Sequence, residues 1–205
     1  MGMTGKTLII IPTVGKDENN LYYEKYLQKL VTSIEENTDE EYEIFLAIND
    51  YVSFSYAVNL GFREMLNRDF TGCVLLNDDM ELKTKGWLTK FTEKSEKEIG
   101  IVSQASQYND YYCGMGCCYL PREVVSKVGF LDEQFRIGEW EDIDYCFRLQ
   151  EAGYKVSTIG EDVAEHGDSP TRMNAPAWAK EEIKKNKERF RIKWQGTEWL
   201  KKVGL

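Results

Sequence analysis

The stretch Val74-Leu75-Leu76-Asn77-Asp78-Asp79-Met80 is an apolar run that ends at two adjacent carboxylates. A short apolar run bounded by a turn-forming residue, here Gly72, is typical of a buried strand. In open α/β sheets, ligands bind outside the carboxyl ends of the strands. Vicinal aspartates repel one another unless a cation, a proton or water separates their charges. The stretch is therefore either a strand with a polar turn or a strand that carries acid to a binding site.

The first eighty residues predict an alternation of strands and helices. Short apolar runs, rich in β-branched residues, predict the strands, and apolar residues at three- and four-residue spacing predict the helices between them. The strands are 7–11, 44–48 and 73–76, and the helices are 23–34 and 54–66. This alternation favours right-handed crossovers and a parallel sheet, in which the polar residues after each strand lie along one edge.

The second half of the chain is less regular. It contains no internal repeat or linker, so a single domain is expected. The glycines Gly114 and Gly116 interrupt one predicted strand, which suggests a bulge or a close approach of the backbone to a ligand. The predicted strands are 99–103, 111–120 and 155–159, and the predicted helices are 87–98, 121–128, 138–152 and 178–194.

The predicted helix that begins near Gly138 has four acidic residues among six at its start, namely Glu139, Glu141, Asp142 and Asp144. Acids in a first turn complement the helix dipole by about 0.3–1 kcal/mol each, which is the structural explanation. One or two acids would serve that purpose. The excess of acidic residues makes this turn a candidate catalytic or binding site.

Composition narrows the class of protein. The 205 residues are 42% hydrophobic and carry a formal charge of −9, which fits a globular protein and argues against a general nucleic-acid binder. Basic residues dominate over 180–193, either as a solvated helix face or as a patch for an anionic acceptor. The oligomeric state is left open.

No apolar run is long enough to cross a bilayer, and the run 8–11 is too short for a signal peptide. The odd number of cysteines, five, predicts reduced core residues and a cytoplasmic location. The spacing of Cys113, Cys117 and Cys118 does not fit a zinc site.

Four motifs occur in a familiar order. They are Ile10-Ile11-Pro12-Thr13, Leu75-Leu76-Asn77-Asp78-Asp79, Gly129-Phe130-Leu131-Asp132-Glu133-Gln134-Phe135 and Glu141-Asp142-Ile143-Asp144-Tyr145-Cys146-Phe147-Arg148-Leu149. In order and separation this series resembles family 2 glycosyltransferases of the GT-A fold. The likeness extends from about Leu8 to Trp194, and its third and fourth motifs are the most specific.

The resemblance implies an α/β fold class: a single, Rossmann-like GT-A domain with a mostly parallel central sheet flanked by helices. The nucleotide-binding half would span about 1–80, the acceptor and catalytic half about 81–170, and a carboxyl-terminal helix about 175–195. The implied activity is transfer of a sugar, with inversion, from a nucleotide-diphospho-sugar, UDP-linked in our interpretation, to an acceptor hydroxyl.

The resemblance also implies a divalent cation, Mn²⁺ or Mg²⁺, that neutralises the leaving diphosphate. Asp79 occupies the family's metal-binding position, and His166 matches a histidine that can complete the metal shell; the alternative for His166 is a hydrogen-bonded structural role. Asn77 stands where many members have an aspartate, so contact with ribose or metal stays open. Residues 77–79 would together form a platform for the metal and the diphosphate. Asp78 fills the variable middle position of this platform and is expected to point to solvent.

Inversion requires a base beside the acceptor hydroxyl. By resemblance this base is Asp142, with Glu141 as the substitute candidate, and Asp144 fixes either the loop or an acceptor hydroxyl. Trp140 and the segment from Gly114 to Gly116 are expected to line the acceptor or sugar pocket, with core packing as the alternative for Trp140.

For the nucleotide, the resemblance points to Pro12 and Thr13, to Asp50 after the second strand, and to Asn59 on the following helix. The acceptor is a glycan or another hydroxyl compound, and peripheral membrane contact through the basic helix is left open.

Two alternative functions remain. A nucleotidyltransferase of similar fold would carry a basic glycine-rich loop after the first strand, but Val14-Gly15-Lys16-Asp17 has one glycine and one lysine. A non-catalytic sugar- or nucleotide-binding module would be supported by loss of Asp79 and Asp142, and both are present.

Overall fold

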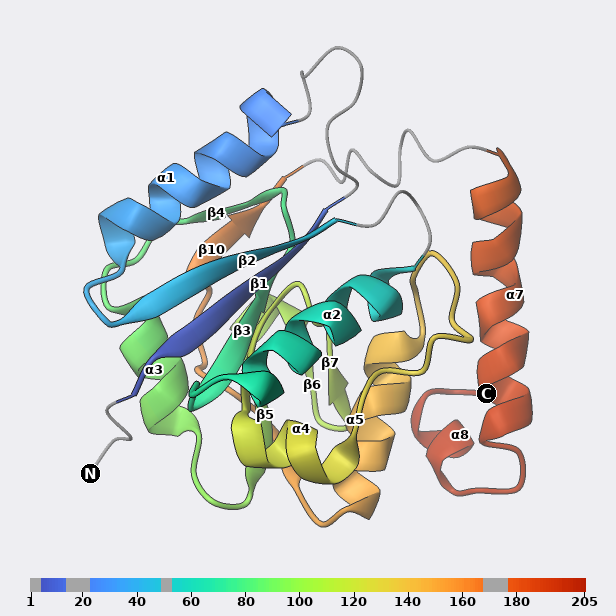
Figure 1. Ribbon diagram of the computed structural model, residues 1–205. Coiled ribbons are helices and arrows are strands. Elements are labelled where there is room, and N and C mark those ends of the chain that lie inside the picture. The colour runs from blue at the N-terminus through green and yellow to red at the C-terminus, as the bar shows by residue number, and fades with distance from the viewer. Residues whose placement is uncertain (1–4, 14–22, 49–52, 168–176) are drawn as a thin grey trace.

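The computed structural model describes residues 5–13, 23–48, 53–167 and 177–205, and a six-stranded sheet forms its centre (Figure 1). Its strands follow the order β2-β1-β3-β8-β5-β9. They are β2 (Tyr42–Ile48), β1 (Thr7–Thr13), β3 (Gly72–Leu76), β8 (Cys117–Pro121), β5 (Ile99–Ser103) and β9 (Lys155–Thr158).

One strand of this sheet is reversed. β1 pairs in parallel with β2 and β3, and β9 pairs in parallel with β5. β8 is antiparallel to both of its neighbours, β3 and β5, so every strand except β8 runs in the same direction. The prediction of a mostly parallel sheet is confirmed.

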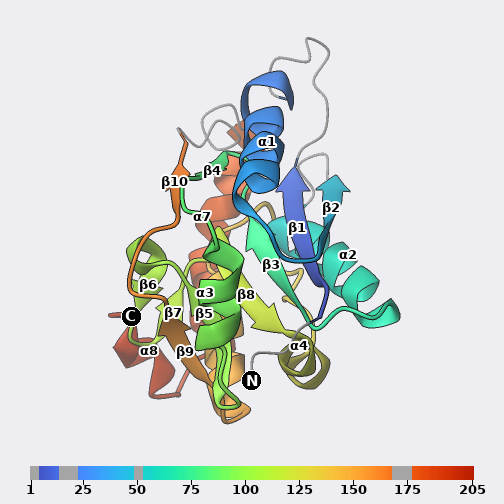
Figure 2. The ribbon, with the colours of Figure 1, turned by 90° about the vertical axis from the view of Figure 1, so that its left-hand side faces the viewer.

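Helices cover both faces of the sheet (Figures 1 and 2). Because side chains alternate along a strand, Ile9 and Ile11 of β1 face one helical layer while Leu8 and Ile10 face the other. The first layer is α1 (Gln28–Asn37), which follows the π-helical turn η1 (Tyr23–Leu27), and α3 (Trp87–Lys94). The second is α2 (Phe54–Asn67), α4 (Arg122–Val128) and α5 (Glu141–Glu151).

The interruption predicted at Gly114 and Gly116 is confirmed, but 111–120 is not a single strand. The chain instead forms a hairpin of β6 (Tyr108–Asn109) and β7 (Tyr112–Cys113), then enters β8 at Cys117. The cause is Gln107, whose backbone carbonyl accepts from Gly114 N at 2.9 Å and whose side-chain oxygen accepts from Cys117 N at 2.8 Å. These bonds give partners to the backbone N–H groups of Gly114 and Cys117, where the chain passes from the hairpin to the sheet.

A second small sheet lies beside the main one. It consists of β4 (Met80–Leu82) and β10 (Ala164–His166), which pair antiparallel and place His166 opposite Met80. Three-residue strands are too short to be detected from hydrophobic alternation, so the sequence did not predict them.

The carboxyl-terminal helices lie beside α5 (Figure 1). Aromatic rings form the contact between them. The helices are α7 (Ala177–Lys193) and α8 (Trp199–Lys202). The ring centroids of Phe147 lie 5.4 Å from those of Trp194 and 4.7 Å from those of Trp199. This third core cluster therefore joins the end of the chain to the helix that carries the acidic turn.

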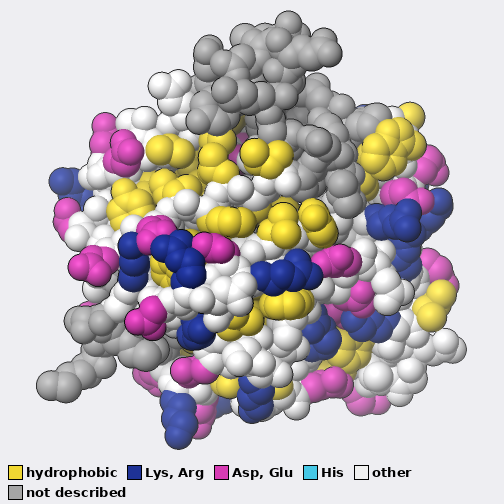
Figure 3. Space-filling model, viewed as in Figure 1, with side chains coloured by type: hydrophobic (Ala, Val, Ile, Leu, Met, Phe, Trp, Pro, Cys, Tyr) yellow, Lys and Arg dark blue, Asp and Glu magenta, His cyan; other side chains and the backbone are white. Residues whose placement is uncertain are grey.

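Several basic residues of α7 are paired within the protein. Each of four basic residues on this helix forms an ion pair with an acid of the same helix: Lys184 with Glu181, Lys185 and Arg189 with Glu182, and Arg191 with Glu188. Figure 3 shows acidic and basic side chains mixed over one face of the molecule. Both observations favour a solvated helix face over a patch for an anionic acceptor.

All five cysteines are free and buried, which confirms them as reduced core residues. Within the described part of the chain, no helix combines the length and the apolar character that a membrane span needs.

Candidate active site

The carboxyl ends of the first three strands meet at one edge of the sheet. β1 lies between β2 and β3, so the connections from β1 to β2 and from β2 to β3 lead to opposite sides of β1, and ligands of open α/β sheets bind at such a point. Pro12 and Thr13 end β1 at this edge, with Thr13 only 4% exposed and paired with Ile48. Asp50 lies outside the described residues.

Three predicted site residues come together where β3 ends. The Nε2 atom of His166 lies 3.5 Å from Oδ1 of Asp79 and 3.4 Å from Nδ2 of Asn77. The pairing of β10 with β4 brings the histidine there, and Gly167 N donates to the carbonyl oxygen of Asp79 at 2.8 Å. The Asp79 side chain is 6% exposed and the His166 side chain 38%, so the pair faces solvent through the histidine.

The contacts of His166 fix which of its nitrogens can bind a cation. Its Nδ1 lies 3.1 Å from the carbonyl oxygen of Gly167. A carbonyl only accepts hydrogen bonds, so in the neutral ring Nδ1 carries the proton and Nε2 presents its lone pair toward Asp79. Metal-binding histidines are oriented by such a bond from the other ring nitrogen.

This donor set fits a divalent cation such as Mn²⁺ or Mg²⁺. A carboxylate oxygen of Asp79 and the imidazole nitrogen of His166 face one another, a combination that suits Mn²⁺ better than Ca²⁺. Over the described residues, no group of three or more His, Cys, Asp or Glu side chains gathers in a metal-binding arrangement. Two protein ligands would leave the rest of the shell to oxygens from outside the chain.

Asp78 differs from expectation. It is 6% exposed and does not point to solvent. The reason is that the acidic stretch is a tight turn, since Met80 N donates to Asn77 O at 3.1 Å and the chain continues directly into β4.

Gly116 brings the start of β8 against the same turn. Asn77 N donates to Gly116 O at 2.9 Å, and a Cβ on this glycine would lie 3.0 Å from Nδ2 of Asn77 and 2.8 Å from Nε2 of Gln107. The close approach expected at Gly116 is therefore to the protein's own side chains. Gly114 has no such contact, since its nearest neighbour would be Gln107 at 3.6 Å. Sequence reasoning missed Gln107, because an isolated glutamine carries no motif.

A strained backbone segment precedes the acidic turn of α5. Ile137, Glu139 and Trp140 have φ values of 68°, 73° and 75°. Non-glycine residues in this left-handed region cost roughly 1–2 kcal/mol each, and the cost is highest for β-branched residues such as Ile137. Such outliers persist only where the surrounding structure imposes them, and they cluster at functional sites. We call residues 137–140 the left-handed segment.

Glu141 is the buried member of the predicted acid pair. It is 6% exposed, and its Oε2 atom has no hydrogen-bond partner among the described residues. Burial raises the pKa of Glu141 to about 8, and the neighbouring charge of Asp142 adds to the shift. Glu141 is therefore protonated at neutral pH and cannot accept a proton there.

We predict that Glu141→Gln flattens the pH dependence of stability. Between the unfolded pKa of 4.5 and the folded pKa of about 8, the folded state binds more protons than the unfolded state. The free energy of unfolding should therefore fall as the pH rises through this window, by on the order of a few kcal/mol, and the stabilising effect of the neutral carboxyl is complete only below it.

Urea unfolding at about pH 5 and about pH 8.5 measures this difference. Glu141→Gln should lose less stability than the wild type, and the exposed Glu151→Gln at the end of the same helix should behave like the wild type. If the free energy of unfolding falls equally between the two pH values in the wild type and in Glu141→Gln, the prediction is contradicted.

Asp142 is the accessible member of the pair. It is half-buried in the first turn of α5, and its Oδ1 accepts from Ile143 N at 2.8 Å. The charge of Asp142 adds to the effect of burial in raising the pKa of the Cys118 thiol. One turn after Asp142, Sγ of Cys146 accepts from Cys113 N at 3.5 Å, so α5 contacts the end of β7. β8 begins beside Asn77, through Gly116. The helix that carries the acid pair and the turn that carries Asp79 thus both contact residues 113–116.

Asp144 joins α5 to α7. It is fully buried, its Oδ2 accepts from Nε of Arg148 at 3.0 Å, and its Oδ1 lies 2.9 Å from Nε1 of Trp194 and 2.8 Å from Nζ of Lys193. Both carboxylate oxygens are engaged inside the protein, so the contacts describe a structural residue that fixes helices, not a contact for an acceptor.

Asp144→Ala should destabilise the protein by about 1–3 kcal/mol, because it leaves the buried indole N–H of Trp194 without its acceptor, while Lys193 keeps its second partner, Asp132. Urea unfolding at neutral pH measures the loss. The exposed pair Lys201–Glu198 is the control, and Glu198→Gln should cost less than about 1 kcal/mol. Equal losses in the two variants would contradict the assignment.

Two further predicted residues use their side chains within the fold. Asn59 is 1% exposed, donates to Leu131 O at 3.0 Å and Glu133 Oε1 at 2.8 Å, and accepts from Leu131 N at 2.8 Å. Trp140 is half-buried, with its ring centroid 5.0 Å from that of Phe190. The structure thus shows packing contacts for both.

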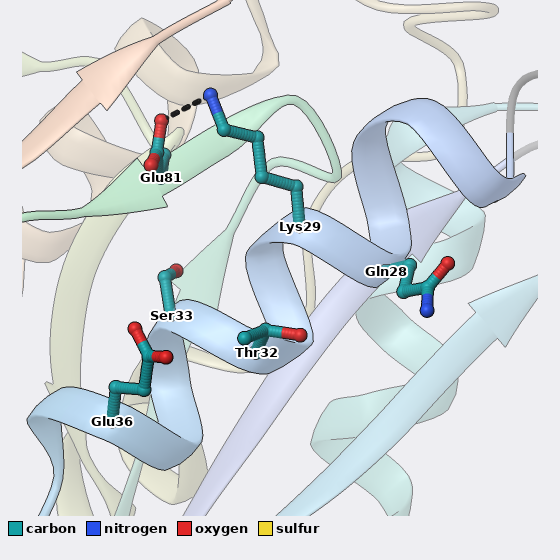
Figure 4. A pocket seen from close by; sticks show the side chains of 6 residues that line it. All are labelled: Gln28, Lys29, Thr32, Ser33, Glu36 and Glu81. Carbon is teal, nitrogen blue, oxygen red and sulfur yellow. Dashed lines mark ion pairs between the residues drawn. The ribbon is translucent and has the colours of Figure 1, made fainter.

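A polar depression lies between α1 and β4, apart from the residues described so far (Figure 4). Lys29 points across it and forms an ion pair with Glu81. Its volume is about 320 Å³, and it is lined by Gln28, Lys29, Thr32, Ser33, Glu36 and Glu81, none of which is a predicted site residue.

Three solved structures share this fold at low sequence identity. A variant of Drosophila β1,4-galactosyltransferase 7, in complex with manganese, UDP-Gal and xylobiose, is 12% identical, with a TM-score of 0.60 over 82% of this chain and 73% of its own. GalNAc-T7 with UDP, GalNAc and Mn²⁺ is 10% identical, with a TM-score of 0.63 over 93% of this chain and 49% of its own. The mannosyltransferase PcManGT from Pyrobaculum calidifontis, with GDP-Man and Mn²⁺, is 14% identical, with a TM-score of 0.56 over 78% and 55%.

No protein-family model and no curated protein matches the sequence. The structural similarity establishes the fold. The chain has the GT-A fold found in glycosyltransferases, which confirms the predicted fold class.

Proposed function

We propose that the protein is an inverting glycosyltransferase, of the family 2 type, that moves a sugar from a nucleotide-diphospho-sugar to an acceptor hydroxyl. The observation that carries the proposal is the meeting of Asp79 and His166, 3.5 Å apart, at the strand edge of a GT-A fold. The three related structures contain Mn²⁺ or manganese and a nucleotide or nucleotide-sugar, which supports the same ligand class here.

Asp79 and His166 would hold the divalent cation, Mn²⁺ or Mg²⁺. When bound, the cation neutralises the charge that develops on the leaving diphosphate. Asn77 stands within reach of the same place, since its Nδ2 lies 3.4 Å from the histidine, and it would contact the donor. Asp78 would complete the platform through the turn that it shares with Asp79.

Asp142 would act as the base. The acceptor oxygen forms a bond to the anomeric carbon on the face opposite the diphosphate, the bond from that carbon to the diphosphate oxygen breaks, and its electron pair stays on the diphosphate. The proton of the acceptor hydroxyl passes to the Asp142 carboxylate, which is only partly buried and would be reachable. Glu141 is the weaker candidate because burial keeps it protonated up to about pH 8.

The donor nucleotide is proposed to be UDP, as in two of the three related structures, whereas the third contains GDP-Man. Pro12 and Thr13 would contact it at the end of β1 and Asp50 after β2. The acceptor is proposed to be a glycan, since the Drosophila enzyme is bound to xylobiose. The chain would work as one domain, with its nucleotide half in about residues 1–80, and in the cytoplasm.

Calorimetric titration of the protein with UDP, GDP, UTP and UDP-sugars, each with and without Mn²⁺, tests the proposal. UDP and a UDP-sugar should bind more tightly with the cation than without it. Preference for the triphosphate would favour a nucleotidyltransferase, and the absence of nucleotide binding in the presence of Mn²⁺ would overturn the proposed function.

A further inference from the structure

The left-handed segment 137–140 needs outside support, since three of its four residues have positive φ values and none of these three is glycine. It leads directly into Glu141 and Asp142. Any relaxation of its backbone would therefore change the direction in which the first turn of α5 presents the two carboxyls. The question is which groups hold it.

Asn186 of α7 holds the segment from one side. Its side chain is fully buried, and its Nδ2 donates to the carbonyl oxygen of Arg136 at 2.8 Å and to that of Gly138 at 2.7 Å. Its Oδ1 accepts from Nη1 of Arg189 at 2.6 Å. One amide thus uses both of its N–H donors on backbone carbonyls and its oxygen on a neighbouring guanidinium.

These two carbonyls are the ones that determine the strain. A carbonyl oxygen lies in the plane of the peptide that joins its residue to the next, so the position of that oxygen fixes the plane in which the next residue begins. Holding the oxygens of Arg136 and Gly138 constrains φ of Ile137 and of Glu139, which are 68° and 73°. The amide therefore acts on two of the three left-handed residues.

The opposite side of the segment is held by α2. Phe54 N donates to the carbonyl oxygen of Ile137 at 2.9 Å, and Oγ of Ser53 donates to that of Phe135 at 3.2 Å. Trp140, the third left-handed residue, packs on Phe190, which lies one turn after Asn186 on α7. The segment is thus fixed between α2 and α7.

We propose that Asn186 is a positioning residue, which holds the left-handed segment so that the first turn of α5 presents Asp142 to the acceptor hydroxyl. This inference rests on the proposed function and gives Asn186 a role that the sequence analysis did not assign. Its effect on the reaction is indirect, through the backbone of residues 137–140.

The test is Asn186→Asp, which has the same shape but replaces the donating amide group with an oxygen that repels both carbonyls. The maximal rate of UDP-sugar turnover with Mn²⁺ should fall by about 10²-fold, as for a misplacement of about 1 Å. The KM for the donor and the affinity for UDP with Mn²⁺ should stay within about threefold of the wild type, because both depend on the β3 edge.

The matched control is Asn37→Asp. Asn37 likewise donates to two backbone carbonyls, those of Ser33 at 2.8 Å and Leu82 at 3.4 Å, but it does so at the end of α1. It should lower the melting temperature without the selective fall in maximal rate. A merely structural role of Asn186 predicts the same kinetic result for both variants, and that result would overturn the proposal.

A second substitution distinguishes an effect of backbone strain in the left-handed segment from a simple loss of the contacts of Asn186. Ile137→Gly, added to Asn186→Asp, should recover at least about tenfold in rate, because glycine adopts positive φ without a steric penalty. Ile137 is not a member of the buried core clusters, so little packing is removed. Absence of recovery would overturn the proposal.

If Asn186→Asp does not fold, Asn186→Ser, which retains one hydroxyl donor, takes its place with the same expectations for rate and rescue. Failure of the wild type to bind UDP with Mn²⁺ would refute the proposed function itself. Normal binding together with a normal rate in the Asn186 variants would refute the positioning role alone.

Discussion

Asp142→Asn should slow sugar transfer by about 10²–10⁴-fold and leave the binding of UDP with Mn²⁺ unchanged. Asparagine keeps the size of the side chain and its oxygen, so it can still accept the hydrogen bond from Ile143 N that Oδ1 now accepts. The asparagine side chain cannot take up the proton of the acceptor hydroxyl at neutral pH. The loss should therefore appear in the chemical step and not in the assembly of the donor site.

Initial rates of transfer and calorimetry with UDP, measured on the same preparations, check this prediction. Glu151→Gln, an exposed acid in the last turn of the same helix, is the control and should transfer at the wild-type rate. Comparison with Glu141→Gln is also informative, because that buried carboxyl is already protonated at neutral pH and its amide analogue should retain much more activity. Wild-type transfer by Asp142→Asn would remove this residue from the role of base.

Asp79→Asn should weaken the Mn²⁺-dependent part of UDP binding by about 10²-fold or more, which corresponds to roughly 3 kcal/mol. The substitution replaces a charged oxygen ligand with a neutral amide, and the only other protein ligand proposed, His166, carries no negative charge. UDP binding without cation should change little. Sugar transfer should fall below detection, because the leaving diphosphate would lack its counter-charge.

Titration of UDP at several Mn²⁺ concentrations measures the effect. Glu81→Gln is a matched control, because it removes the same charge as Asp79→Asn from a position two residues further along the chain. Its carboxylate is paired with Lys29 and Lys83, away from the proposed cation. A Mn²⁺ dependence of UDP binding that survives Asp79→Asn would show that the cation is held elsewhere.

The strands that build the site could be predicted because their signals are local. The runs 7–11, 44–48 and 73–76 all lie within observed strands, and the polar residues after them mark the binding edge. The acidic turn on α5 was also visible as an excess of carboxylates. What the pattern alone did not show was that His166 faces Asp79, because a three-residue strand, β10, brings it there.

The parts that the sequence did not predict depend on contacts between distant residues. Nothing about Ile137 or Glu139 indicates positive φ, because the conformation is imposed by Asn186 from nearly fifty residues further along the chain. For Asp144 the sequence analysis left two roles open, fixing the loop or contacting an acceptor hydroxyl. Its spacing of four from Arg148, however, is typical of an ion pair on one helix face. That signal could have identified it as structural.

The reversed direction of β8 has a consequence for how such a site can change. β5 ends at Ser103 on the same edge where β8 begins at Cys117, so the intervening connection both leaves and re-enters the sheet beside the proposed reaction centre. Residues 104–116, which include the β6–β7 hairpin, can therefore vary in length and composition without shifting any strand pairing of the six-stranded sheet. We expect differences in acceptor preference among proteins of this architecture to concentrate in this connection, while the sheet that holds the donor stays constant.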